Sequence, residues 1–277
     1  MHVPDHMLND PTEAIAALGA AATLAAVALR PHRATDGAAD AQAARHTETL
    51  VAQPDRLAPQ AATAALVFGL QMVNVPVLSG TSGHLLGGAL ATALVGPRRA
   101  LLAVSAVVAT QALLFADGGV GALGVNLWLI AILPVAFAAA ARAVLRRRAP
   151  GSGPIVAAVP AALLAPAASA LAFAGLHSVG GTVAVDGGEL ITRMVGVHLA
   201  IGVAEALLTV AVLGAVVSVG ERAVPAAAVL SSAALSLLAS SAPDGLERVA
   251  GDLGFAVTGS GSVLEGRSPL AGYVIAG

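Results

Sequence analysis

The sequence predicts an all-α integral membrane protein, and its composition supports that prediction in three ways. Of the 277 residues, 57% are hydrophobic and only 11% are charged, and the mean hydropathy is +0.85. So few charged side chains cannot cover the surface of a water-soluble domain. Aromatic residues make up only 3%, so the helices must pack through Ala, Leu, Val and Gly, as helices in lipid do.

Runs of mostly apolar residues predict seven or eight transmembrane segments, since one span needs about 20 such residues. The first run has Asn9 or Asp10 as its N-cap and Pro11 at its first helical position, and it ends at Arg30. A polar connection covering 32–59 follows it. The run at 83–95 is short for a full span. In chain order the runs are 11–29, 61–78, 83–95, 100–115, 123–145, 155–175, 190–219 and 224–238.

The arginines predict the orientation of these spans, because cytoplasmic loops carry the excess of positive charge. All 14 basic residues are Arg, and 11 of them fall in cytoplasmic connections if the N-terminus lies outside. The opposite orientation would place those 11 outside. The sequence therefore predicts an extracytoplasmic N-terminus.

Two further features of the composition exclude whole classes of function. The formal net charge of −2 gives no basic field for binding nucleic acid. Cys is absent, which excludes disulfides, thiolate metal sites and Cys nucleophiles. Any metal ion must therefore be bound through nitrogen or oxygen.

The first residues predict one half of a metal site. They lack the basic n-region and cleavage site of a secretory signal, and because His2 is large we expect Met1 to stay in place with a free amine. The Met1 amine, the His2 amide and a His2 ring nitrogen would then form fused chelate rings. A planar set of nitrogens suits Ni(II) or Cu(II) and accommodates Co(II). The simpler alternative is an accidental surface histidine.

The fourth nitrogen is predicted in the segment Gly80-Thr81-Ser82-Gly83-His84-Leu85-Leu86-Gly87-Gly88. This polar, Gly-rich turn should lead into a helix with His84 in its first turn, on the same membrane face as Met1. The positive end of the helix dipole would then keep His84 neutral, the form that binds metal. The alternative is that Gly83 and Gly87 form a GxxxG packing face with His84 as a bystander.

Other polar residues within the predicted spans have competing interpretations. His198 and Glu205 lie seven residues apart on one helical face, where they could pair, line a metal path or, as we favour, bridge helices. Gln71 and Asn74 precede Pro76 and would bind the backbone groups that the proline frees or hold the turn that carries His84, together with Ser82.

Several segments together resemble the CbiM/NikM family, the substrate-binding (S) membrane component of nickel/cobalt energy-coupling-factor (ECF) ABC transporters. The segments are 1–8, 71–88 (QMVNVPVLSGTSGHLLGG), 111–126 (QALLFADGGVGALGVN) and 196–209 (GVHLAIGVAEALLT). The resemblance extends over roughly residues 1–219. It implies a bundle of about seven helices, and it implies that Met1, His2 and His84 bind the metal.

The resemblance also implies a function and a set of partners. The chain would import Ni(II) or Co(II) as the transported substrate, in the cell (inner) membrane of a bacterium or archaeon. It has no GxxxxGK[ST] loop, so two cytoplasmic ATPase subunits and a transmembrane coupling (T) protein would supply the energy. Nickel and cobalt stay open alternatives, because selectivity at a nitrogen site depends on geometry and supply.

Residues 243–247 (PDGLE) are similar to the motif that names the PDGLE domain of the small accessory component, CbiN/NikN. We therefore divide the chain into a metal-binding membrane domain, 1–220, and a PDGLE segment, 221–277. The accessory component has a helix on each side of an outside loop. The second of these is expected beyond Gly277, either in a missing piece or in a separate small accessory membrane protein.

Two other function classes were weighed against this one. An intramembrane metallohydrolase is disfavoured, because HExxH and paired mid-span carboxylates are absent from the sequence. A stand-alone secondary metal-ion transporter would use His198 and Glu205 as its coupling pair. Metal uptake by the lone chain without ATP would favour that alternative.

Overall fold

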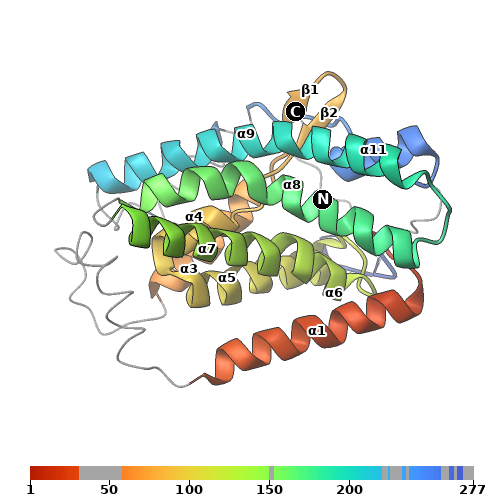
Figure 1. Cartoon of the computed structure of the whole chain (residues 1–277), viewed down its shortest axis with the longest axis horizontal. Coiled ribbons are helices and arrows are strands. Elements are labelled where there is room, and N and C mark those ends of the chain that lie inside the picture. The colour runs from red at the N-terminus through yellow and green to blue at the C-terminus, as the bar shows by residue number, and fades with distance from the viewer. Residues whose placement is uncertain are drawn as a thin grey trace.

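The computed structural model describes most of the membrane domain and parts of the C-terminal segment (Figure 1). The described residues are 1–30, 58–149, 153–219, 224, 233–234, 237–256, 262–264 and 267–270. Most of the predicted polar connection 32–59 and of the eighth run 224–238 lies outside them, as does the predicted domain boundary at 220.

Within the described residues, five helical segments are long and apolar enough to cross a membrane, and they lie roughly side by side in Figure 1. They confirm the prediction of an all-α, multi-pass membrane protein. Two of them contain a π-helical turn, a feature that is frequent at functional sites. The segments are α1 (Asp10–Leu29), α5 (Pro97–Thr110) with η1 (Gln111–Phe115), α6 (Leu123–Asn126) with η2 (Leu127–Ile132) and α7 (Leu133–Arg148), α8 (Pro154–Gly180), and α9 (Gly187–Val219).

The helix boundaries have local causes that the sequence shows. Asn9 caps α1, since its side chain accepts a hydrogen bond from the backbone N–H of Thr12 at 3.0 Å. Proline also stands in the first turn of α1, α5 and α8, where its missing N–H costs nothing.

The predicted runs 61–78 and 83–95 are not continuous helices. The first contains α3 (Ala58–Gln71) and then β1 (Val75–Leu78), which pairs antiparallel with β2 (Thr81–Gly83). Helix α4 (Gly88–Val95) begins only after Gly87, which has a φ of +79°. The prediction that His84 stands in the first turn of a helix is therefore wrong. His84 lies in the segment without regular secondary structure between β2 and α4.

Close backbone approaches and buried hydrogen bonds join the helices, as expected for packing in lipid. Gly202 of α9 lies directly against the backbone carbonyl of Leu163 in α8. The Ser169 hydroxyl of α8 donates to the Leu129 carbonyl at 2.7 Å, and the Trp128 indole donates to the Ala16 carbonyl of α1 at 3.1 Å. A short helix of the PDGLE segment, α11 (Gly245–Leu253), packs against α9.

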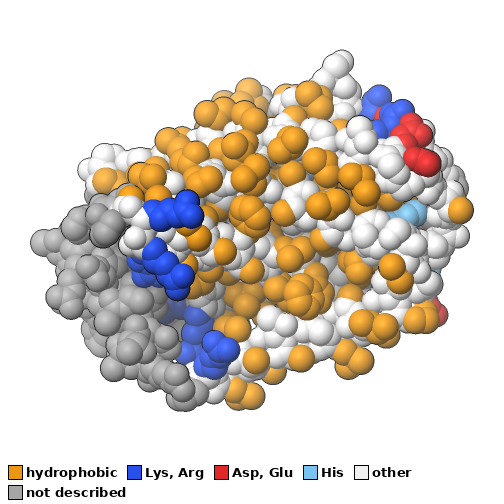
Figure 2. Space-filling model, viewed as in Figure 1, with side chains coloured by type: hydrophobic (Ala, Val, Ile, Leu, Met, Phe, Trp, Pro, Cys, Tyr) orange, Lys and Arg blue, Asp and Glu red, His pale blue; other side chains and the backbone are white. Residues whose placement is uncertain are grey.

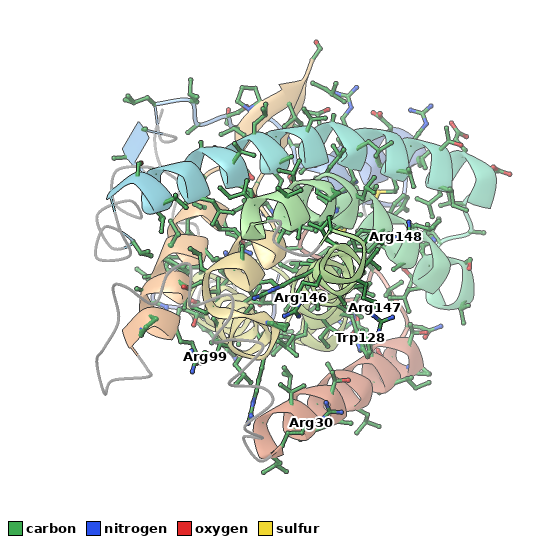
Figure 3. The ribbon with its side chains drawn as sticks, turned by 60° about the vertical axis from the view of Figure 1, so that its left-hand side comes forward. Arg30, Arg99, Trp128, Arg146, Arg147 and Arg148 are labelled. Carbon is green, nitrogen blue, oxygen red and sulfur yellow. The ribbon has the colours of Figure 1, made fainter. Side chains whose placement is uncertain are left out.

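Charged side chains divide between the two ends of the bundle, with a broad apolar surface between them (Figure 2). Figure 3 shows arginines of α1, α5 and α7 at one end. The N-terminal segment lies at the other end, because the Asn9 N–H donates to the Gly180 carbonyl at the end of α8 at 2.7 Å. This distribution favours the predicted orientation with the arginine end in the cytoplasm. The labelled arginines are Arg30, Arg99, Arg146, Arg147 and Arg148.

Candidate metal centre

The α-amine of Met1 is buried at the centre of the candidate site. Its nitrogen lies 2.7 Å from His84 Nε2 and 2.9 Å from a carboxylate oxygen of Asp244. Met1 as a whole is only 3% exposed. Two predicted nitrogen ligands, which are 83 positions apart in the sequence, are therefore in direct contact.

The segment between η1 and α6 holds the N-terminal residues in place. Val3 donates its N–H to the Asn126 side chain at 2.7 Å, and the same amide group donates back to the Val3 carbonyl at 3.0 Å. Asp5 accepts from the backbone N–H of Gly121 at 2.7 Å. Gly118 has a φ of +85°, and a Cβ there would lie 2.8 Å from the Asn126 amide nitrogen and 3.3 Å from His2 Cβ. The glycines of this segment therefore let the chain pass close to His2.

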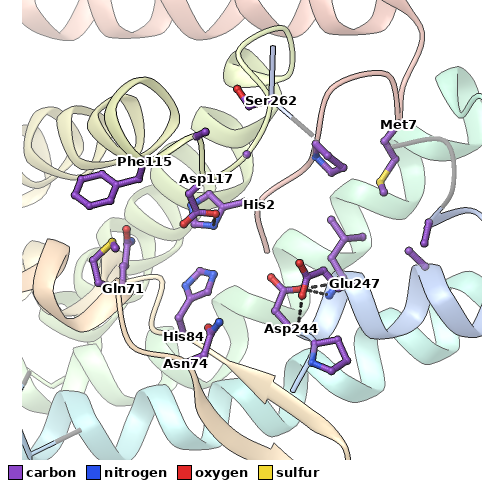
Figure 4. A pocket seen from close by; sticks show the side chains of 18 residues that line it. His2, Met7, Gln71, Asn74, His84, Phe115, Asp117, Asp244, Glu247 and Ser262 are labelled. Carbon is purple, nitrogen blue, oxygen red and sulfur yellow. Dashed lines mark hydrogen bonds and ion pairs between the residues drawn. The ribbon is translucent and has the colours of Figure 1, made fainter. Parts of the chain in front are cut away.

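His2 faces both His84 and Asp117 (Figure 4). Its ring stacks on the His84 ring with 5.0 Å between centroids, and its Nδ1 lies 3.3 Å from an Asp117 carboxylate oxygen. Among the described residues, neither His2 Nε2 nor the His2 backbone N–H has a hydrogen-bond partner. The amide that the chelate would use is thus not engaged elsewhere in this part of the chain.

Two neighbouring helices fix the segment that carries His84. The Glu205 carboxylate of α9 accepts hydrogen bonds from the backbone N–H groups of Leu86 at 3.0 Å and Gly87 at 3.1 Å. Gln71, the last residue of α3, donates to the Leu86 carbonyl at 2.7 Å. These bonds satisfy backbone groups that no secondary structure pairs. Glu205 and Gln71 therefore hold the backbone just after His84.

Burial favours the neutral form of the two candidate imidazole ligands. Desolvation lowers the pKa of the His2 ring, and it lowers the pKa of His84 well below the usual range, with the Met1 ammonium acting in the same direction. The neutral imidazole predicted for His84 thus comes from burial and not from a helix dipole. Burial is the largest single influence on Asp244 and opposes its ionisation, but the Met1 ammonium, neighbouring charge and the hydrogen bonds to the carboxylate together outweigh burial and hold the pKa of Asp244 below its ordinary value.

The other predicted residues are distributed around this centre. Ser82 donates its hydroxyl to the Ala242 carbonyl at 2.6 Å. Asn74 lines the same cavity as His2 and His84, with a volume of about 620 Å³, and its buried side-chain oxygen has no partner among the described residues. His198 Nδ1 contacts the Met194 carbonyl at 2.8 Å. Glu205 bonds the His84 segment as described above, so neither residue has the other as its partner.

The geometry also identifies residues that the sequence did not mark as functional. Asp244, Asp117 and Asn126 all contact the first three residues. The PDGLE motif drew attention to Asp244, but nothing in the motif indicates a partner at the other end of the chain. Within the described residues, no three His, Asp or Glu side chains form a metal site by themselves.

The comparisons with known proteins agree with this fold. Residues 2–223 match the family model CbiM, described as "Cobalt uptake substrate-specific transmembrane region". A protein of Haloquadratum walsbyi named for metal transport is 32% identical over 76% of this chain and 88% of its own length. A protein of Lactiplantibacillus plantarum named for fused nickel transport (LarMN) is 34% identical over 48% of this chain and 36% of its own length.

A solved structure has the same fold. The crystal structure of a transition metal transporter covers 79% of this chain and 93% of its own, with a TM-score of 0.60 and 24% identity. At that identity the likeness concerns the fold alone. The family match, by contrast, extends over most of the sequence, residues 2–223. The chain therefore belongs to the CbiM family of cobalt uptake substrate-specific transmembrane regions.

Proposed function

We propose that this chain is the substrate-binding component of an ECF-type ABC importer and captures Ni(II) or Co(II) at the extracytoplasmic face. The observation that carries the proposal is the buried Met1 amine, 2.7 Å from His84 Nε2. Buried titratable groups with shifted pKa values cluster at functional sites. Both nitrogens have a lone pair available for a metal once the amine has lost its proton.

Covalent geometry assigns the remaining ligand atoms. Only Nδ1 of His2 can close a six-membered chelate ring with the backbone nitrogen of the same residue. The amine and that backbone nitrogen close a five-membered ring, so three nitrogens lie in one plane and His84 Nε2 supplies the fourth. A square of nitrogens suits Ni(II), and Co(II) is accommodated. During loading, the metal takes over the His2 Nδ1 position that faces Asp117 in the structure.

Family membership supports the proposed partners. A substrate-specific region implies other subunits that supply energy, and we propose a transmembrane coupling protein, two cytoplasmic ATPases and a small accessory membrane protein. A secondary transporter would need Glu205 as a mobile coupling group, but both its carboxylate oxygens accept backbone hydrogen bonds. ATP-independent uptake of Ni(II) by the lone chain in vesicles would contradict the ECF proposal.

Blocking the Met1 amine tests the proposed site directly. Acetylation, or extension by one residue before Met1, removes the lone pair or its position, so we expect Ni(II) affinity to fall at least about a hundredfold. The same one-residue extension placed at the C-terminus is the matched control and should leave Ni(II) binding unchanged. Mass spectrometry would verify the N-terminus, and circular dichroism the helix content. Normal Ni(II) binding by a verified blocked protein would refute the site.

A further inference from the structure

The PDGLE segment contacts both halves of the candidate metal centre. One carboxylate oxygen of Asp244 lies 2.9 Å from the Met1 amine. The backbone carbonyl just before it, at Pro243, accepts from the Ser82 N–H at 2.9 Å, and the Ala242 carbonyl accepts from the Ser82 hydroxyl at 2.6 Å. Ser82 precedes His84 by two residues. Three consecutive residues therefore hold the amine and the segment that carries the imidazole.

The two oxygens of Asp244 have different partners. Oδ1 caps α11 by accepting from the backbone N–H groups of Leu246 at 2.7 Å and Glu247 at 2.9 Å. Glu247 completes the capping box by accepting from the Asp244 N–H at 2.9 Å. Oδ2 is left to contact Met1. The helix cap thus fixes the direction in which the second oxygen points (Figure 4).

Helix α11 itself is fixed to the membrane domain. Its residues Leu246, Val249 and Ala250 are buried in the same apolar core as Met1 and Val3. Gly245 lies so close to α9 that a Cβ there would approach His198 Cε1 to 2.9 Å. The position of Asp244 is therefore set by packing rather than by the weak attraction of an exposed ion pair.

We propose that Asp244 is a positioning residue that directs the Met1 amine toward His84, so that the PDGLE segment preassembles the metal centre. This inference rests on the proposed function. A carboxylate that accepts a hydrogen bond from a metal ligand orients that ligand and increases its basicity, as second-shell carboxylates do for metal-bound histidine. An amine bound to a metal keeps two N–H groups, so Asp244 has a donor before and after loading.

The charges support the same role. Before loading, the ammonium places one positive charge beside Asp244. A divalent cation that displaces one proton from the amine and one from the His2 amide also leaves one net positive charge there. The buried carboxylate is therefore compensated in both conditions, whereas an unpaired buried charge would be strongly destabilising.

Asp244→Asn is the sharpest variant for testing this role. Asn is as good an N-cap as Asp, so α11 keeps its cap while the charge beside the amine is lost. We expect Ni(II) affinity of the full-length protein in detergent to fall by about ten- to a hundredfold. The absorption band of square-planar Ni(II) should keep its position, because no ligand atom has changed. Affinity would be measured by competition with a chromogenic chelator.

Asp252→Asn is the matched control, because it removes the same charge from the same helix but at a residue whose ion pairs, in the described part of the chain, are with Arg193 and Arg248. It should bind Ni(II) as the wild type does. His84→Ala removes a proposed ligand, and its Ni(II) affinity shows how far binding falls when the site itself is lost. Affinity of Asp244→Asn within about twofold of the wild type would overturn the positioning role, and so would a shifted absorption band, which would make Asp244 a ligand.

A second variant covers the case in which Asp244→Asn does not fold. Ser82→Ala removes the hydroxyl bond to the PDGLE segment and leaves Asp244 intact, and we expect it to weaken Ni(II) binding about three- to tenfold. Unchanged affinity in Ser82→Ala would then overturn the proposal. Failure of the proposed function gives a different result, because the wild type would bind no Ni(II) or would bind it equally well with its amine blocked.

Discussion

Burial determines the protonation state of the His2 and His84 rings. Both rings are buried, and burial lowers both pKa values, so both rings are neutral at pH 7. Only two of the predicted ligand groups then carry a proton that a metal must displace. These are the Met1 amine, which pairs with Asp244 as an ammonium, and the His2 amide.

We therefore expect about two protons to be released for each Ni(II) bound at pH 7. Ni(II) binding should weaken as the pH falls, because protons compete with the metal for the amine and amide nitrogens. Because burial lowers the pKa of both histidines, the rings add to this effect only at a pH below the ordinary histidine range. Calorimetry in buffers of different ionisation enthalpy counts the protons. Release of none would exclude the amide, and release of about four would mean that both rings start protonated.

Two connections between helices determine the position of the ligands. One is the hairpin β1 and β2 with the irregular segment before α4, and the other is the Gly-rich segment 116–122 between η1 and α6. In both, carboxylates from distant parts of the sequence accept backbone hydrogen bonds. Glu205 accepts from the first connection and Asp5 from the second.

Gly118→Ala tests the element between η1 and α6. A Cβ at a φ of +85° and 2.8 Å from the Asn126 amide nitrogen should displace the segment, at a cost of about 1–3 kcal/mol. We expect a lower thermal midpoint and weaker Ni(II) binding. Gly214→Ala is the control, since no atom lies within 4 Å of the Cβ position in helix α9. It should keep full binding and should not lower the midpoint. Equal effects of both variants would contradict the assigned role.

The elements also show how far the sequence could predict this structure. Long apolar runs such as 155–175 appear as helices, because length and hydropathy determine a span. The runs 61–78 and 83–95 misled the prediction because apolar residues continue through β1, where Pro76 lacks an N–H and the chain is extended. An apolar run alone does not distinguish a helix from a strand.

At the site, Met1, His2 and His84 were predicted and the structure brings them together. The contacts of Asp244 and Asn126 with the N-terminal residues were not predicted. They join residues more than a hundred positions apart. Such contacts are products of the tertiary fold, and no local pattern encodes them.

At the scale of the whole molecule, the separation of charge along the bundle predicts how the protein sits in the membrane. Arg147 follows the apolar part of α7 at one end, and Val179 closes α8 at the end that holds the N-terminal segment. The positive-inside rule assigns the arginine end to the cytoplasm.

Because the chain lacks Cys, single substitutions can test this orientation. Val179 is 82% exposed, so Val179→Cys should react with a membrane-impermeant maleimide on intact cells. Arg147→Cys should react only after the cells are permeabilised. The reverse pattern would show that the N-terminal segment faces the cytoplasm and that the orientation is wrong.

The ion pair between Met1 and Asp244 also has a consequence for biosynthesis. Asp244 is synthesised 243 residues after Met1. At a synthesis rate of about 5 to 20 residues per second, the amine waits roughly 10 to 50 s for its carboxylate partner. The nascent chain therefore inserts its early helices before the N-terminus can be fixed, and a ribosome that stalls before Asp244 leaves a chain with an unpaired amine. Assembly of the proposed metal centre thus depends on translation through Asp244.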